Sequence, residues 1–238
     1  MSYQYFARVY DLLTRNIDYA AIAKCYDGIL RKKGITLDLC CGTGTLCQMM
    51  SEKGYDMIGA DISADMLSQA MRKRSESEAN IVYICQAAEK LDLFGTVQNT
   101  ICSLDSLNHL PDETAFFTAV ERVGLFTEQN GMFVFDLNTE YKHRMILGNN
   151  RFTYETEAVR LEWQNALQPD GSVAMTLEFF EDGVFIAAEQ FTERLFSETQ
   201  VVEALSRAGF DLAETFDGFT KNPPHTESQR ITYAAVKV

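Results

Sequence analysis

A pair of glycines, Gly42 and Gly44, stands directly after a short apolar run that contains Asp38. Glycine lets the backbone adopt positive φ and lets a ligand approach the main chain closely. A helix beginning near Thr43 would bring unpaired N–H groups and a partial positive charge to this turn. The combination of glycine turn, helix start and carboxylate predicts a nucleotide-type ligand site at the end of a buried strand in an α/β sheet.

The residues after the turn argue against two common phosphate-binding motifs. Dinucleotide enzymes use G-x-G-x-x-G, but Cys47 occupies the position of the third glycine. The phosphate-cradling loop G-x-x-x-x-G-K-[ST] is missing as well, because no lysine follows the turn. We therefore do not expect the turn to hold pyrophosphate, although a nicotinamide-dependent oxidoreductase stays open as an alternative.

A second carboxylate, Asp61, ends the next expected strand, two residues before Ser63. Ligands lie beyond the carboxyl ends of the strands in open α/β sheets, so Asp61 and the glycine turn are expected to face one site. A carboxylate there can accept hydrogen bonds from both hydroxyls of a ribose. The alternative is a structural role, in which Asp61 only favours the start of the following helix.

These segments together resemble the motifs of class I S-adenosylmethionine-dependent methyltransferases of the small-molecule type. The segment 37–45 is similar to the first motif, hydrophobic-D-hydrophobic-G-C-G-T-G, with Cys40 where a glycine is usual; a positive φ would be costly there. The segment 101–110 is similar to the fourth motif, at the methionine end of the cofactor, and Ala88 stands where a backbone N–H meets the adenine. The resemblance implies S-adenosyl-L-methionine as cofactor, with the binding residues Asp38, Cys40, Cys41, Gly42, Thr43, Gly44, Asp61, Ile62, Met66, Ala88, Glu89, Leu104 and Asp105.

The resemblance also implies methyl transfer to a small molecule by in-line displacement, in which the protein mainly orients and desolvates the reactants. A base is needed only if the nucleophile must lose a proton. His109, Tyr141 and Tyr10 are candidates, but the sequence shows no catalytic triad and no metal-binding cluster, so the catalytic residue stays unassigned and no metal is expected. A binding module for S-adenosylmethionine without activity is a further alternative.

Composition restricts the partners. The 238-residue chain carries a formal charge of −13, and phosphate backbones require clustered basic residues, so nucleic acid is not expected as a substrate. No run of about 18 apolar residues predicts a membrane span, and Arg8 and Asp11 interrupt the apolar N-terminus, unlike a signal peptide. Six cysteines without a C-x-x-C pair fit a reducing cytoplasm. We expect a cytoplasmic monomer or homodimer with a small-molecule substrate.

Strand and helix patterns alternate from residue 35, which predicts a mainly parallel sheet. The expected strands are Ile35–Leu39, Asp56–Ala60, Ile81–Gln86, Thr100–Leu104 and Met132–Asp136, followed near the C-terminus by 211–217 and 229–236. Between them, Ser63 is expected to cap a helix, Pro111 to begin another, and residues 129–131 to form a turn. The fold expected from the resemblance is Rossmann-like, with seven strands, mostly parallel, and helices on both faces. Residues 2–30 predict two helices; the segment 5–11 either closes over the cofactor or packs on the sheet as an amphipathic helix.

The periodicity changes in residues 152–195, where apolar and polar residues alternate as in half-buried strands. Turn signals at 169–171 and 181–183 predict a three-stranded antiparallel insertion. Ser197 and Gln200 form a capping box that restarts a helix. We therefore expect a cofactor-binding core at 1–151 and 196–238 and an inserted subdomain at 152–195 that covers the substrate. Its aromatic residues suit an apolar or amphipathic acceptor, or alternatively form the core of the insertion or a dimer contact.

Overall fold

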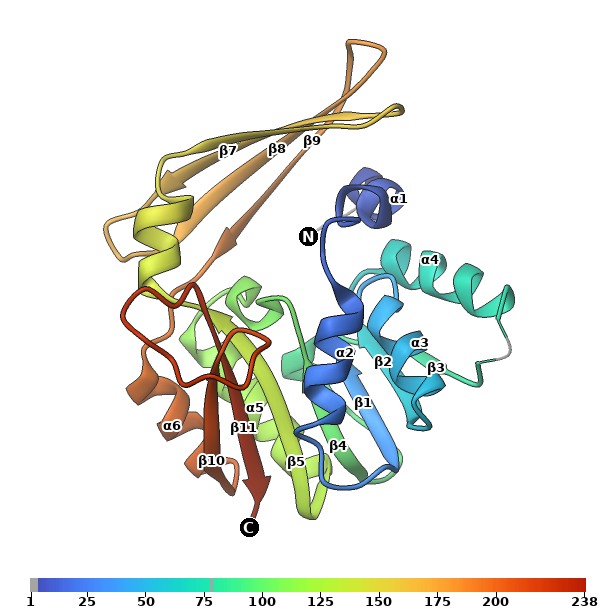
Figure 1. The fold of residues 1–238 in the computed structure, drawn as a ribbon, viewed down its shortest axis with the longest axis vertical. Helices are drawn as coiled ribbons and strands as arrows, with labels where there is room; N and C mark the ends of the chain where they lie inside the picture. The colour runs from blue at the N-terminus through green and yellow to red at the C-terminus, as the bar shows by residue number, and fades with distance from the viewer. Residues whose placement is uncertain (1–3, 78) are drawn as a thin grey trace.

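The computed structural model describes residues 4–77 and 79–238, so residues 2 and 3 of the expected N-terminal helix lie outside the described part. A seven-stranded sheet forms the larger layer, and a four-stranded sheet lies apart from it (Figure 1). The larger sheet, sheet A, contains β1 (Ile35–Leu39), β2 (Asp56–Asp61), β3 (Val82–Cys85), β4 (Val97–Cys102), β5 (Thr127–Asn138), β10 (Phe210–Asp217) and β11 (Arg230–Lys237). Its helices are α2 (Tyr19–Asp27), α3 (Thr45–Glu52), α4 (Ala64–Ser75), α5 (Glu113–Phe126) and α6 (Glu198–Arg207).

The strand order of sheet A is β10-β11-β5-β4-β1-β2-β3, and only β11 runs antiparallel to its two neighbours. This arrangement confirms the Rossmann-like, mostly parallel fold. Side chains of β5 alternate between the two faces, as in a strand covered on both sides. Phe133 and Phe135 pack with α5 and α6, whereas Met132 and Val134 pack with α2 and α3. Helices therefore cover both faces of sheet A, and the carboxyl edge of its parallel strands remains for a ligand.

The boundaries of several elements differ from the sequence-based expectation because side chains and bulges move them. Helix α5 does not begin at Pro111, because the Asp112 side chain accepts a hydrogen bond from the Ala115 N–H and caps the helix. The expected turn at 129–131 lies inside β5, where Asn130 has φ 63° and the register with β4 shifts. The caps predicted for α4 by Ser63 and for α6 by the Ser197 capping box are present.

The smaller sheet, sheet B, has four antiparallel strands rather than the three expected: β6 (Arg151–Glu155), β7 (Arg160–Leu167), β8 (Val173–Glu181) and β9 (Val184–Glu193). The additional strand is β6, an edge strand whose residues are all exposed or half-buried. The turn after β6 contains neither glycine nor proline, and the Thr156 side chain stabilises it through hydrogen bonds with Val159. The usual turn signal was therefore absent from the sequence.

Helix α1 (Gln4–Leu13) connects the two sheets. Its apolar side chains pack against the core of sheet B, and the Tyr5 ring centroid lies 5.0 Å from that of Phe179. On its other side lies α4 (Figure 1). Asp11 of α1 pairs with Lys73 of α4 at 2.8 Å. The amphipathic N-terminal helix thus packs on sheet B and is attached to sheet A by a polar contact. No helix in the described part of the chain is long and apolar enough to cross a membrane.

Candidate active site

The turn after β1 has positive φ at every second residue. Cys40, Gly42 and Gly44 have φ of 59°, 53° and 72°. The left-handed conformation costs an L-residue about 1–2 kcal/mol, so Cys40 occupies a position that favours glycine. Gly44 is also required by packing, because a Cβ there would lie 2.3 Å from the Tyr83 hydroxyl oxygen. The turn is therefore held in one conformation, and α3 begins directly after it with Gly44 as its N-cap.

Asp61 connects this turn to the start of α4. One carboxylate oxygen accepts the Gly42 N–H at 2.8 Å, and the other accepts the Ser63 N–H at 2.8 Å. Burial raises the pKa of Asp61, while these backbone hydrogen bonds oppose the rise. Each carboxylate oxygen has a further lone pair, so Asp61 retains acceptor capacity for two hydroxyl groups of a ligand.

Asp38 lies deeper, at the end of β1, and is almost fully buried. The Cys47 thiol donates to its carboxylate at 3.3 Å, so the residue that replaces the third glycine has its own polar partner. Burial raises the pKa of Asp38 to about 7. A small cavity of about 40 Å³ beside Asp38 is lined by Cys41, Thr43 and other residues of the turn. This cavity can take a small polar group of a ligand that rests on the turn.

A larger cavity of about 500 Å³ lies between the carboxyl edge of sheet A, helix α1 and the inner face of sheet B. A volume of this order is typical of a pocket for a drug-sized ligand. Among the expected cofactor residues, this cavity is lined by Cys40, Gly42, Asp61, Ile62, Met66, Ala88, Glu89, Leu104 and Asp105. Cys41 and Thr43 line the small cavity, and Gly44 lines neither of the two. Sheet B contributes aromatic side chains such as Trp163 and Phe191.

The loop after β4 is strained and held by a buried carboxylate. Leu104 and Asp105 have φ of 58° and 55°, and their N–H groups donate to Asp136 at 2.9 and 2.8 Å. Arg230 of β11 pairs with both Asp136 and Asp105. The Arg230 guanidinium outweighs the effect of burial and holds the pKa of Asp105 well below its usual range. The loop is therefore fixed by contacts to two other strands.

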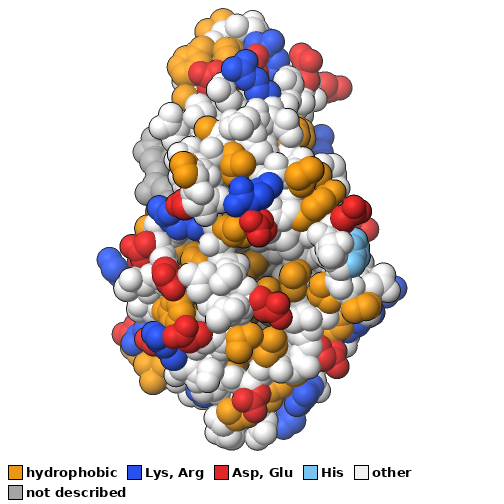
Figure 2. All heavy atoms as spheres, turned by 90° about the vertical axis from the view of Figure 1, so that its left-hand side faces the viewer, with side chains coloured by type: hydrophobic (Ala, Val, Ile, Leu, Met, Phe, Trp, Pro, Cys, Tyr) orange, Lys and Arg blue, Asp and Glu red, His pale blue; other side chains and the backbone are white. Residues whose placement is uncertain are grey.

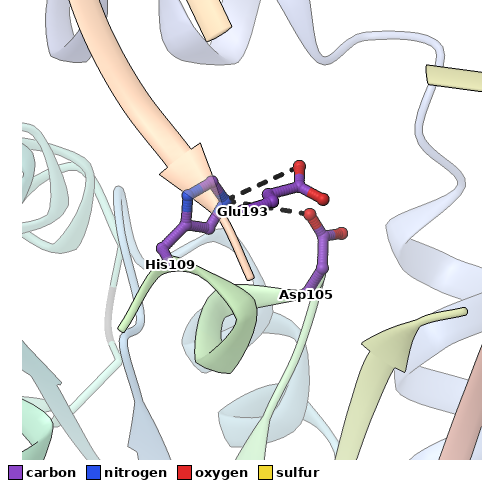
Figure 3. A group of neighbouring side chains, drawn as sticks. All are labelled: Asp105, His109 and Glu193. Atoms are coloured by element: carbon purple, nitrogen blue, oxygen red, sulfur yellow. Dashed lines mark ion pairs between the residues drawn. The ribbon is translucent and has the colours of Figure 1, made fainter. Parts of the chain in front are cut away.

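His109, at the end of the short 3₁₀ helix η2 (Ser106–His109), faces two carboxylates. Its Nε2 atom lies 3.8 Å from Asp105 Oδ2 and 4.0 Å from Glu193 Oε1, and both carboxylates face the same edge of the imidazole (Figure 3). Glu193 is only 5% exposed, and its other oxygen accepts from Asn138 Nδ2 at 2.6 Å. Burial lowers the pKa of His109, but Asp105 and Glu193 outweigh it and raise the pKa overall.

Asp105, His109 and Glu193 place their donor atoms within 4.8 Å of one another, and no other group of the described residues offers such a metal-binding arrangement. Arg230 pairs with the Oδ1 atom of Asp105, whereas the Oδ2 atom of Asp105 faces His109. Stable metal sites use three or four protein ligands. The expectation that no metal is bound stays a prediction.

Comparison with known proteins identifies the family. The family profile described as "Methyltransferase domain" matches residues 36–124. YqeM of Bacillus subtilis, a protein whose name describes a methyltransferase, is 30% identical to this chain over 242 residues. The aligned region covers 100% of this chain and 98% of that protein. This chain belongs to the S-adenosylmethionine-dependent methyltransferases.

Solved structures of methyltransferases share the fold. An S-adenosylmethionine-dependent methyltransferase from Clostridium acetobutylicum superimposes with a TM-score of 0.87 at 28% identity, over 99% of this chain and 98% of the other. The CcbJ methyltransferase from Streptomyces caelestis has a TM-score of 0.82 at 17% identity, over 93% of this chain and 90% of the other, which shows the shared fold alone. The cofactor of the present methyltransferase is S-adenosylmethionine.

The three candidates for a catalytic base lie in different places in this methyltransferase. His109 and Tyr10 line the large cavity, whereas Tyr141 does not. Glu193 and Arg230 also line the cavity, although no sequence pattern marks them as site residues. Glu193 is the last residue of β9 and Arg230 is the first residue of β11, and neither lies in a recognisable motif. Only their position next to the loop after β4 reveals them, and this position depends on the packing of both sheets.

Proposed function

We propose that this methyltransferase transfers the methyl group of S-adenosylmethionine to a small-molecule acceptor that binds beneath sheet B. One continuous cavity carries the proposal, because it joins Asp61 and Gly42 at the cofactor end to Trp163 and Phe191 on sheet B. The residues 152–195 act in this proposal as the cover of the substrate site. Acidic and basic side chains are interspersed on the face in Figure 2, which lacks the basic patch that a nucleic-acid substrate requires.

The residues of the first cavity wall fit the cofactor. Asp61 has acceptor capacity for the ribose hydroxyls, and the positive φ of Gly42 brings the backbone close to the cavity. Asp38 and the small cavity beside Cys41 suit the polar amino-acid end. When bound, the cofactor supplies an activated methyl group on a sulfonium. The chain holds the two reactants in line, and the apolar walls of α1 and sheet B exclude water.

The chain contains a single tryptophan, Trp163, which provides a direct test because it lines the acceptor side of the cavity. Labelled S-adenosylmethionine is incubated with the protein and with a bacterial extract that has been separated by size. We expect label in the fraction below about 1 kDa, since a cavity of this volume holds only drug-sized ligands. We also expect an acceptor from that fraction to change Trp163 fluorescence. Label that enters only protein or nucleic acid would refute the proposal.

A further inference from the structure

The charge of the large cavity is unbalanced. Four carboxylates line it, from Asp61, Glu89, Asp105 and Glu193, against the single guanidinium of Arg230. Asp61 accepts a hydrogen bond from the glycine turn at the cofactor end of the cavity, and Asp105 is paired with Arg230. Glu193 is therefore the carboxylate on the sheet B side that has no cationic partner from lysine or arginine within ion-pair distance in the described chain. An anionic acceptor would be repelled here, and a cationic one would be attracted.

The two carboxylate oxygens of buried Glu193 differ in their partners. Its Oε2 atom accepts from Asn138 at 2.6 Å and lies 3.3 Å from His143 Nε2. Among the described residues no hydrogen bond reaches Oε1, which lies 4.0 Å from His109 Nε2. A carboxylate that is 5% exposed needs a partner for each oxygen, because an uncompensated buried charge costs several kcal/mol. The arrangement leaves Oε1 as an acceptor for a donor on the ligand.

The surroundings of Oε1 suit a cation with an apolar body. Phe191 contacts the imidazole of His109, with ring centroids 5.1 Å apart. Trp163 and Tyr154 line the same cavity from β7 and β6, and their rings stack at 6.2 Å. Aromatic faces attract ammonium groups, most strongly when both are removed from water. A carboxylate, an imidazole and aromatic rings thus meet at the acceptor end of the cavity.

We infer that the methyl acceptor is a primary or secondary amine, held as its ammonium form by Glu193 and deprotonated by His109. The inference rests on the proposed function and names its substrate class. The ammonium transfers one proton to His109 Nε2, which frees the nitrogen lone pair. The amine then forms the N–C bond to the methyl group while the C–S bond breaks and its electron pair goes to sulfur. The product is a methylated ammonium, and His109 returns its proton to water.

Several charged groups face His109 and set its behaviour. Asp105 lies on its own segment, Glu193 comes from β9, and Lys142 comes from the π-helix η3 (Lys142–Leu147). Lys142 donates to Asn138 at 2.8 Å, and Arg230 acts through its pair with Asp105. The two carboxylates stabilise the imidazolium that forms when the proton arrives. An entering ammonium has the opposite effect and helps His109 to release a previously bound proton.

The test compares isosteric amines and alcohols on the intact protein with saturating S-adenosylhomocysteine. Benzylamine with benzyl alcohol, and cyclohexylamine with cyclohexanol, are titrated against Trp163 fluorescence and by calorimetry. We expect each amine to bind at least tenfold more tightly than its alcohol. Glu193→Gln should abolish this preference and leave the affinity for S-adenosylhomocysteine unchanged. The control Glu162→Gln, which removes a half-exposed carboxylate outside the cavity lining, should retain the preference.

The methyl-transfer assay separates the role of His109. With an amine that is turned over, His109→Gln should lower kcat at least tenfold with little change in KM, and should remove the rise of the rate with pH. Equal binding of amine and alcohol by the wild-type protein overturns the inference and requires no variant. Activity that appears only with an added divalent metal, or turnover of alcohols, phenols or thiols but not amines, also overturns it. Absence of any methyl release with bound cofactor would instead refute the proposed function.

Discussion

Replacement of Asp61 by Asn should remove most of the affinity for S-adenosylmethionine while the protein stays folded. In the structure each carboxylate oxygen accepts one backbone N–H at 2.8 Å, from Gly42 and from Ser63. An amide has only one acceptor oxygen, so its NH₂ group would face one of these N–H donors. In the proposed binding mode the change therefore removes the charge that faces the ribose, and it also disturbs the glycine turn.

The magnitude follows from the hydrogen bonds that are lost. A hydrogen bond to a charged group contributes about 1.5–3 kcal/mol, and the proposed binding mode places two ribose hydroxyls on this carboxylate. Asp61 is only 9% exposed, so water cannot readily replace these contacts. A total loss of about 3 kcal/mol corresponds to an increase of roughly 100-fold in Kd.

Calorimetric titration with S-adenosylmethionine and with S-adenosylhomocysteine measures this change. The matched control is Asp56→Asn at the opposite, exposed end of the same strand, β2. We expect the control to bind as the wild-type protein does, and circular dichroism should show that both variants are folded. If folded Asp61→Asn binds within threefold of wild type, Asp61 does not hold the ribose and the assignment of the cofactor end is wrong.

Cys40→Gly should stabilise the protein by about 1 kcal/mol, measured by urea unfolding, because Cys40 has positive φ. Asp38→Asn should flatten the pH dependence of stability. The folded state binds the Asp38 proton up to about pH 7, so wild-type stability falls as pH rises from about 4 to 7, by up to roughly 4 kcal/mol. Lys73→Met removes the ion pair with Asp11 and should speed amide exchange in α1 several-fold.

Each of these predictions has its own control or contrary outcome. A destabilised Cys40→Gly would show that packing of the thiol outweighs the backbone strain. A pH profile for Asp38→Asn that is parallel to wild type would place the buried proton elsewhere. For Lys73→Met the control is Arg72→Met, since Arg72 lies on the same helix and contacts exposed Glu76, through an ion pair at 3.4 Å, and Gln69 of that helix, through hydrogen bonds. Equal exchange in both variants would show that Lys73 does not fix α1.

Local chemistry made much of sheet A predictable from sequence. The strand Ile35–Leu39 was predicted with its observed bounds, and the caps at Ser63 and Ser197 depend on residues within three positions. The failures have local causes too. β6 ends without glycine or proline, and Asn130 forms a bulge within β5 where a chain-reversing turn was expected. In the first place a side chain stabilises a turn that has neither glycine nor proline. In the second place a positive φ produces a bulge inside the strand instead of a turn between elements.

The candidate site also contains one part that the sequence predicts and one part that only the fold reveals. The turn at 40–44 and Asp61 follow one another in a recognisable motif, so the sequence alone predicts them as site residues. Glu193 approaches His109 only because β9 ends beside η2, where the Arg194 N–H donates to the Asn108 carbonyl at 2.7 Å. No spacing rule connects residues that are 84 positions apart. Charge and burial become informative at such positions only when the fold is known.

The strained loop after β4 shows how this distant packing controls the chemistry. Leu104 and Asp105 both adopt positive φ, a conformation that must be compensated by other contacts. Asp136 compensates it by accepting both N–H groups, and Arg230 neutralises the buried charge of Asp136. The same arginine pairs with Asp105, which faces His109. The position of the proposed base therefore depends on a residue of β11 that lies more than 120 positions later in the chain, and a change at Arg230 should disturb the loop and the acceptor site together.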